Sequence, residues 1–165
     1  METKKIEYEG AKIQVYKYEP ADVPVILQPF LLWYTSAIIS EDYGFRKPPI
    51  PEDFTEKISC YILGYWHKYG AGVDAFEIID DKINLIEIKG TTTDTGFQGN
   101  INEEYFDALI WFDFSGYKKL EYKIFKLAKE LFIGHNVKLN LKTIVSVHNI
   151  APICIGKIGL INNLQ

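Results

Sequence analysis

The hydrophobic period of this 165-residue chain changes from 3.6 to 2 residues at positions 70–72, and this change constrains the fold most. Residues 73–79 and 83–90 alternate apolar and polar side chains around an Asp-Asp-Lys turn, which predicts a hairpin of two strands. Before position 70, one apolar stripe repeats at helical spacing: Phe54, Ile58, Tyr61, Ile62 and Tyr65. A one-sided helix next to a half-apolar hairpin predicts helices packed on a sheet.

The helix that starts at Pro51 is expected to be covered on both sides. Pro51 suits a first turn, and Glu52 and Asp53 favour the positive end of the helix dipole. Glu56 falls roughly opposite the apolar stripe, next to a second stripe that is half apolar: Ser59, Cys60 and Leu63. We therefore do not expect Glu56 to be an ordinary surface carboxylate.

The other elements follow from apolar alternation and from the positions of glycine and proline. They are a hairpin at 5–18 with its turn at Glu9-Gly10, a helix at 28–40, a loop at 42–51, a polar loop at 91–102, strands at 105–114 and 120–126, a short helix at 127–132, a strand at 143–147, and a strand or irregular segment at 153–161. This order predicts an α/β or α+β fold, a mixed sheet flanked by helices.

Length and composition indicate a single domain, residues 1–165. Hydrophobic residues make up 47% of the chain and aromatic residues 15%, which is enough for a packed core and excludes a largely disordered protein. Within this domain we expect an N-terminal hairpin and helix at 1–45, a core that carries the chemistry at 51–148, and a C-terminal segment at 149–165.

Charge and cysteine content narrow the class of protein further. A net charge of −4 with one arginine, Arg46, argues against a polybasic binder. Two prolines interrupt the apolar residues 23–39, which disfavours a membrane span, and no signal-peptide pattern follows Met1. Cys60 and Cys154 lie far apart, so a disulfide is open but not required. We expect a cytoplasmic protein with reduced thiols and no membrane partner.

Three ionisable side chains are expected to meet at one end of the central hairpin. Glu87 and Lys89 alternate onto one face of the second strand, with Cα atoms about 6.6 Å apart. Asp74 starts the first strand, which places it beside the end of its antiparallel partner. Ile83 and Leu85 share the face of Glu87, so we expect a mostly buried face. Grouped charges there are costly unless an ion or a function requires them.

Such a cluster favours the hydrolysis of a phosphodiester. Two neighbouring carboxylates suit a hard divalent cation such as Mg²⁺, which polarises a phosphoryl oxygen and lowers the pKa of a bound water. A lysine beside the cation can orient or deprotonate that water. The alternative is a cross-strand salt bridge on a solvated face. The histidines have no metal-ligand or triad spacing and are expected to be structural or exposed: His67, His135 and His148.

Asp74, followed on the next strand by Glu87-Ile88-Lys89, resembles the core motif of the PD-(D/E)xK nuclease superfamily, whose elements follow an αβββαβ order. Val73 stands where the motif has proline, a departure that concerns packing more than chemistry. Residues 43–61 resemble the loop and first helix of a small family of type II restriction endonucleases, which cut a short GC-rich palindrome with an unspecified central base. The resemblance extends over residues 30–126.

The resemblance implies a role for each residue of the motif. Asp74 and Glu87 would bind the metal together with the backbone carbonyl of Ile88, and Lys89 would activate the attacking water. Glu56 would be an accessory acidic residue that binds the metal or supports its ligands. The implied cofactor is Mg²⁺, with Mn²⁺ as a substitute, and the implied reaction is sequence-specific hydrolysis of double-stranded DNA.

A second set of residues would contact the DNA. Arg46 and Lys47 would grip phosphate or guanine, and the loop after the catalytic strand offers donors and acceptors for bases: Thr91, Thr92, Thr93, Gln98 and Asn100. For each of these residues the alternative is an ordinary structural role in its loop.

A palindrome cut on both strands implies two active sites related by a two-fold axis, hence a homodimer. Phe30, Trp33 and Tyr34 are candidates for its interface, with burial in the core as the alternative. A restriction enzyme also implies a cognate DNA methyltransferase in the same system, though not as a stable partner. Two other functions stay open: a structure-specific or repair nuclease of the same fold, and a non-catalytic DNA-binding module.

Overall fold

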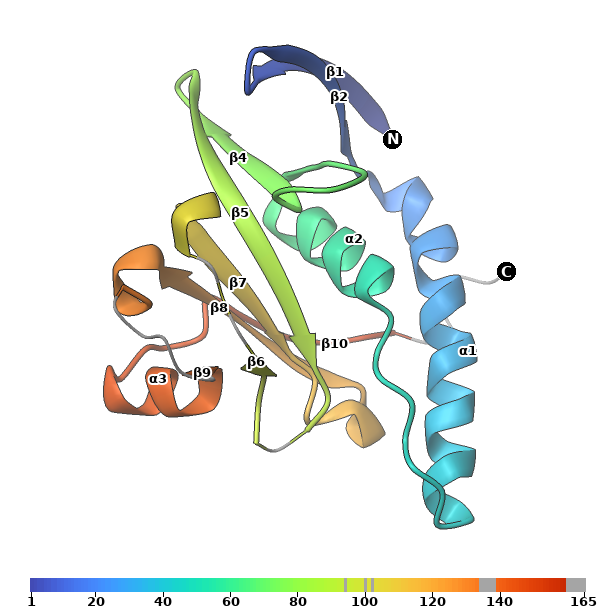
Figure 1. The fold of residues 1–165 in the computed structure, drawn as a ribbon. Helices are drawn as coiled ribbons and strands as arrows, with labels where there is room; N and C mark the ends of the chain where they lie inside the picture. The colour runs from blue at the N-terminus through green and yellow to red at the C-terminus, as the bar shows by residue number, and fades with distance from the viewer. Residues whose placement is uncertain (94, 100, 102, 134–138, 160–165) are drawn as a thin grey trace.

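The computed structural model describes residues 1–165 except 94, 100, 102, 134–138 and 160–165. In the described residues, eight strands form one mixed sheet in the order β1-β2-β3-β4-β5-β7-β8-β10 (Figure 1). Their bounds are β1 Glu2–Tyr8, β2 Ala11–Lys17, β3 Trp66–His67, β4 Ala75–Ile79, β5 Lys82–Thr91, β7 Ala108–Asp113, β8 Glu121–Ala128 and β10 Cys154–Lys157. β5 and β7 run parallel, and the other neighbours are antiparallel.

Two tight turns close the hairpins of this sheet. β1 and β2 are joined at Glu9 and Gly10, with φ of 51° and 75°, and β4 and β5 at Asp80 and Asp81, with φ of 48° and 62°. Positive φ at both central residues is typical of the turns whose twist matches that of a hairpin. Both turns lie where the sequence predicts them.

Helices cover both faces of the sheet, which confirms the predicted fold class. α1 (Val23–Asp42) and α2 (Glu52–Leu63) lie on one face, and α3 (Leu141–Val147) lies on the other (Figure 1). The main core beneath α1 and α2 contains large side chains of both helices and of the sheet: Phe30, Trp33, Phe54, Ile86, Ile88 and Phe112. A second core lies beneath α3: Leu109, Trp111, Leu127 and Leu141.

α2 packs closely against β5. Both predicted stripes of the helix are covered, because its buried residues come from two sides: Phe54, Thr55, Ile58, Ser59 and Cys60. A Cβ atom on Gly90 would lie only 2.4 Å from Cγ2 of Thr55, so no larger residue fits at position 90 without moving the helix. The glycine thus lets the first turns of α2, with their acidic side chains, approach the strand.

Residues 143–147 form a helix, and the strand predicted there is wrong. The Asn140 side chain accepts a hydrogen bond from the backbone N–H of Thr143 at 3.2 Å and caps α3. Leu141, Ile144 and Val145 pack against the second core at helical spacing. The β-branched residues of this segment favour a strand by propensity, but the cap and the apolar spacing prevail.

The structure gives three other predicted segments in more detail. The short helix predicted at 127–132 is the end of β8 followed by a 3₁₀ turn, Lys129–Leu131. The segment predicted at 153–161 as a strand or irregular supplies β10, which pairs with β8. Within the polar loop 91–102, Gln98–Gly99 form strand β6, which pairs with β9 (Leu139–Asn140).

α1 is long and apolar, starts earlier than predicted and continues through Pro29. The stretch Pro20–Asp42 has the length and mean hydropathy, 1.5, of a membrane span, and 22% of its most apolar 18-residue window is buried. One side of the helix belongs to the main core: Ile26, Phe30, Trp33 and Ala37. The other side exposes apolar residues, among them Val25, Leu32 and Ile39.

Candidate active site

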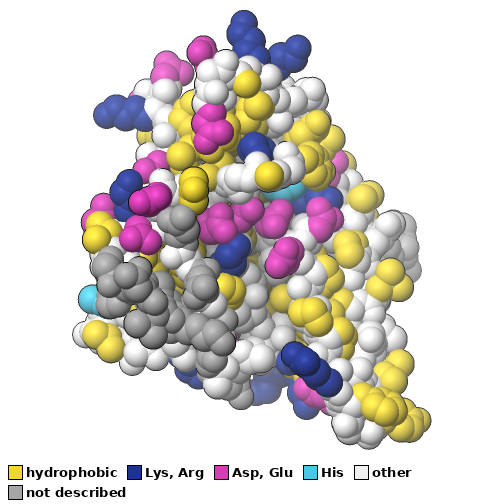
Figure 2. Space-filling view, viewed as in Figure 1, with side chains coloured by type: hydrophobic (Ala, Val, Ile, Leu, Met, Phe, Trp, Pro, Cys, Tyr) yellow, Lys and Arg dark blue, Asp and Glu magenta, His cyan; other side chains and the backbone are white. Residues whose placement is uncertain are grey.

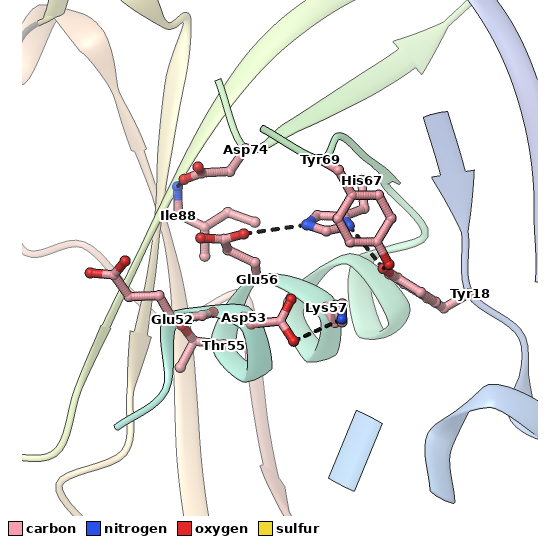
Figure 3. A network of polar contacts seen from close by, with 10 residues as sticks. All are labelled: Tyr18, Glu52, Asp53, Thr55, Glu56, Lys57, His67, Tyr69, Asp74 and Ile88. Atoms are coloured by element: carbon pink, nitrogen blue, oxygen red, sulfur yellow. Dashed lines mark hydrogen bonds and ion pairs between the residues drawn. The ribbon is translucent and has the colours of Figure 1, made fainter. Parts of the chain in front are cut away.

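The candidate active site lies where β5 extends past the start of β4. Asp74 directly precedes β4, and its backbone N–H donates to the Ile86 carbonyl at 3.1 Å. At the next hydrogen-bonding position of β5, the partner is the Asp74 side chain and not a backbone carbonyl. The backbone N–H of Ile88 donates to Asp74 Oδ2 at 2.7 Å (Figure 3). The N–H and C=O of a strand residue point to the same side, so the Ile88 carbonyl shares this edge with the Asp74 carboxylate.

Glu87 and Lys89 lie on the face of β5 that is turned away from α2. They alternate with Ile86 and Ile88, which are buried beneath the helix. Glu87 Oε1 and Lys89 Nζ are 2.5 Å apart, and the two side chains are 22% and 29% exposed. The predicted burial of this face is wrong at its far end, where Ile83 is exposed because the β4–β5 turn projects beyond the helices (Figure 1).

Negative charge exceeds positive charge at this edge. Burial and the charge of Glu87 raise the pKa of Asp74 to about 7, and Glu56 adds to the shift. Burial lowers the pKa of Lys89, but the hydrogen bond and charge of Glu87 and the charge of Asp74 outweigh burial, so its pKa is raised. Figure 2 shows acidic side chains gathered around a basic one in the middle of the molecular surface that faces the viewer. A bound cation would relieve this excess.

Glu56 approaches the site from α2. Its side chain is 23% exposed, and its Oε2 lies 3.3 Å from Nε2 of His67 (Figure 3). The expectation that this carboxylate differs from ordinary surface residues is therefore confirmed. One turn earlier on the helix, the exposed Glu52 contributes to the raised pKa of Lys89. The sequence indicates only that Glu52 favours the helix dipole, because the position of Glu52 relative to Lys89 depends on the packing of α2 on β5.

His67 and Tyr18 are absent from the predicted site, although both reach its border. His67 is 1% exposed and lies between Glu56 and Tyr18, whose hydroxyl is 2.8 Å from Nδ1. Of the two roles expected for this histidine, structural or exposed, the structure shows the first. Tyr18 follows the end of β2, Glu56 lies on α2 and His67 lies on β3, and no spacing along the chain signals their contact.

The oxygen donors at the edge of β5 fit a hard divalent cation. Asp74 and Glu87 offer carboxylates and Ile88 offers a backbone carbonyl, which are ligands that Mg²⁺ accepts alongside water. Among the residues that the structure describes, no group of three or more His, Cys, Asp or Glu side chains is close enough to hold a metal ion. The carboxylate of Glu56, a further predicted ligand, faces His67 here.

A surface pocket joins the loop before α2 to the end of β5. Arg46, Lys47, Thr92 and Thr93 line it together with two prolines. Lys47 Nζ donates to the Thr92 carbonyl at 2.9 Å and lies 4.1 Å from the centre of the Tyr117 ring, while Arg46 is exposed. The tertiary structure thus brings together two predicted groups of DNA-contacting residues that lie 45 positions apart.

The other predicted DNA contacts are placed differently. Thr91 is buried, and its hydroxyl accepts a hydrogen bond from the indole N–H of Trp111 at 3.0 Å. The backbone of Gln98 belongs to β6. The Gln98 side chain and the whole of Asn100 lie outside the described part of the chain.

Comparison with known proteins identifies the family. The model of the Bsp6I restriction endonuclease family matches residues 18–147, a range that includes α1, α2, the β4–β5 hairpin and the pocket at Arg46. No curated protein and no solved structure matches the chain. The family match covers most of the chain and every residue of the candidate active site. The chain therefore belongs to the Bsp6I restriction endonuclease family, a family of nucleases that act on DNA.

Proposed function

We propose that this chain is a type II restriction endonuclease of the PD-(D/E)xK superfamily, which hydrolyses double-stranded DNA at a specific sequence with Mg²⁺ as cofactor. One observation carries the proposal: the Asp74 carboxylate and the Ile88 carbonyl share the open edge of β5, next to the Glu87–Lys89 pair. The family match gives this arrangement its substrate class, DNA.

Each residue has its own part in the proposed reaction. Bound Mg²⁺ would polarise the scissile phosphate and lower the pKa of a water molecule, and Mn²⁺ would substitute. Asp74, Glu87 and the Ile88 carbonyl would hold the cation, and Glu56 would support them. The raised pKa of Lys89 favours its charged form, so we assign it to orienting the water and stabilising charge on the phosphate rather than to proton abstraction.

The pocket lined by Arg46, Lys47, Thr92 and Thr93 is the proposed DNA contact. Arg46 is exposed and offers the forked donors that suit guanine or phosphate. Lys47 ties its loop to Thr92 and so keeps the pocket together. Thr91 is left out of the proposed contact because it does not line the pocket and its hydroxyl accepts a hydrogen bond from Trp111.

The Arg46→Ala variant tests the pocket. It should weaken DNA binding and reduce the slope of log affinity against log salt concentration by about one, since one phosphate-type contact is lost. Arg46→Lys, which keeps the charge, is the matched control. Fluorescence anisotropy with labelled duplex at several salt concentrations measures both quantities. Equal affinity and slope for Arg46→Ala and the wild type would exclude Arg46 as a contact.

We further propose that the chain acts as a homodimer in the cytoplasm, in a system with a cognate DNA methyltransferase. Phe30 and Trp33 are 0% and 5% exposed, so they take the core role that the sequence left open. The exposed side of α1 is the better interface, because residues 23–40 carry no charge and its exposed apolar residues repeat every seven positions: Val25, Leu32 and Ile39. In a two-fold dimer the same surface of both copies is in contact, and two uncharged stripes can pack together without charge repulsion.

Digestion of unmethylated plasmid and phage DNA, with Mg²⁺ or with EDTA, tests the proposed activity. We expect discrete, reproducible fragments with Mg²⁺ and intact DNA with EDTA, and sequencing of the fragment ends would give the site. A smear would show a nuclease without strict sequence specificity. Intact DNA under every condition would contradict the proposal, and branched DNA would then be the next substrate.

A further inference from the structure

A line of polar side chains leads through the interior from the N-terminal hairpin to the candidate site (Figure 3). His67 is its centre: Nε2 lies 3.3 Å from Oε2 of Glu56, and Nδ1 lies 2.8 Å from the hydroxyl of Tyr18. That hydroxyl lies 3.2 Å from the hydroxyl of Tyr69. Both ring nitrogens of this histidine, which is 1% exposed, therefore have polar partners, as buried polar atoms require, and one of these partners is the carboxylate beside the candidate site.

The chemistry of these groups sets the direction of each hydrogen bond. An ionised carboxylate only accepts, so Nε2 of His67 carries a proton and donates to Glu56. In a neutral imidazole Nδ1 then accepts, and the hydroxyl of Tyr18 donates to it. The same hydroxyl accepts from Tyr69. Burial raises the pKa of Tyr18, which keeps its phenol protonated for this purpose.

The ring of His67 is also held by packing and by its backbone. It meets the Tyr69 ring edge-on, with ring centres 4.7 Å apart. β3 is only two residues long, and in it His67 pairs with Ala75 of β4. The next backbone N–H of the chain donates to the carbonyl of Asp74 at 2.9 Å. The imidazole is therefore fixed relative to the same segment that presents Asp74.

We propose that His67 is a positioning residue that holds the Glu56 carboxylate beside the active site, and that Tyr18 orients the imidazole for this task. Glu56 and Asp74 lie close enough for their charges to interact (Figure 3), so the two carboxylates repel each other. A flexible glutamate would swing away from such a neighbour unless a donor held it, and the N–H of His67 is that donor. The inference rests on the proposed function, since it concerns a supporting ligand of that site.

Substitution at position 67 tests the proposal. His67→Phe keeps a ring but removes the donor, and we expect a single-turnover cleavage rate about 10- to 100-fold lower, with more Mg²⁺ needed for half-maximal rate. DNA binding measured in Ca²⁺ should stay unchanged. His67→Gln, which retains an N–H donor, should recover part of the rate. Tyr18→Phe removes one hydroxyl only, and we expect it to shift the Mg²⁺ requirement in the same direction even if His67→Phe does not fold.

Tyr65→Phe is the matched control, because the Tyr65 hydroxyl donates to Glu77 at 3.1 Å outside the candidate site. Its cleavage rate and Mg²⁺ requirement should stay within about twofold of the wild type. In a double variant, His67→Phe should add little to the loss caused by Glu56→Gln, because the histidine acts through that carboxylate.

Three results would overturn the proposal: losses that multiply in the double variant, an equal loss in Tyr65→Phe, or a His67→Phe enzyme with normal rate and normal Mg²⁺ requirement. A wild-type protein that leaves DNA intact would instead contradict the proposed function itself. The two failures are therefore distinguishable in one set of assays.

Discussion

The surroundings of Asp74 shift the pKa of its carboxyl group in opposite directions. The Ile88 N–H stabilises the carboxylate, while burial and the charge of Glu87 favour the neutral acid. Burial and Glu87 prevail, and the pKa rises from its ordinary value of 3.8 to about 7. In metal-free protein this side chain therefore changes its charge within the neutral range, which links folding stability and cation binding to pH.

This link gives a pH prediction with a definite sign. Between about pH 4 and pH 7 the folded protein holds a proton on Asp74 that the unfolded chain has lost, so the free energy of unfolding should fall as the pH rises. Asp74→Asn, which keeps an oxygen acceptor for Ile88, should remove this dependence. Urea unfolding in EDTA at pH 5 and pH 8 measures it in both proteins. Parallel pH curves for the two proteins would refute the assignment.

Mg²⁺ should counteract the loss of stability at high pH. In the proposed site the cation would bind the deprotonated carboxylate, so its stabilising effect should grow as Asp74 ionises. In the same unfolding experiment, saturating Mg²⁺ should raise the unfolding midpoint more at pH 8 than at pH 5. A gain that is equal at both pH values, or that persists in Asp74→Asn, would show that the cation binds elsewhere.

Loss of the Lys89 side chain should slow DNA cleavage without weakening DNA binding. In the proposed reaction its ammonium stabilises charge that develops in the transition state, so Lys89→Ala should lower the cleavage rate at least about 100-fold. Affinity for the DNA site, measured by anisotropy in Ca²⁺, should remain within a few-fold of the wild type. Lys126→Ala, which removes a lysine paired with Glu77, is the control. Normal cleavage by Lys89→Ala would show that the active site has been assigned wrongly.

At the scale of elements, the contact between α2 and β5 decides the geometry of the site. The strand contributes Glu87, Ile88 and Lys89, and the helix contributes Glu56 from the other direction. Gly90 permits their close approach, because a side chain there would meet Thr55. The packing of α2 on β5, rather than any single hydrogen bond, sets how near the acidic side chains of the helix come to this strand.

Gly90→Ala should therefore disturb both stability and activity. The added Cβ must displace α2, so we expect a loss of about 1–3 kcal/mol in the free energy of unfolding and slower cleavage. Gly159→Ala is the matched control, since a Cβ there meets no atom within 4 Å. Urea unfolding and single-turnover cleavage measure the two effects. A Gly90→Ala protein as stable and active as the control would show that the contact adapts without cost.

At the scale of the whole molecule, the proposed cleavage of both DNA strands requires two active sites, and the exposed apolar side of α1 is the proposed interface between the two copies. The exposed apolar side of α1 lies on the outer surface of the domain (Figure 1). We expect light scattering to give the mass of a dimer for the wild type and of a monomer for Leu32→Lys, because Leu32 is 77% exposed and its substitution leaves the core intact. Ile79→Lys, at an exposed apolar residue on β4, should remain dimeric. A wild type that is monomeric with and without DNA would contradict this interface.

Much of the architecture was accessible from local patterns. The two hairpin turns, the strands on either side of them and the helix α2 follow from positive-φ residues and hydrophobic periods that act over a few positions. The expected meeting of Asp74 with Glu87 and Lys89 also depends on one hairpin only. The helix α3 was missed because its β-branched residues favour a strand, while the cap at Asn140 and the core beneath it favour a helix.

The sequence by itself determined the mixed sheet, the covered helix after Pro51, and the carboxylate–lysine group on the central hairpin. The tertiary structure alone decided that Glu56 meets His67, that Gly90 receives Thr55, and that Lys47 reaches Thr92. Periodicity and turn chemistry act between neighbours in the chain, so they can be read from the sequence. Contacts between residues of different elements depend on how those elements pack, which no local pattern encodes.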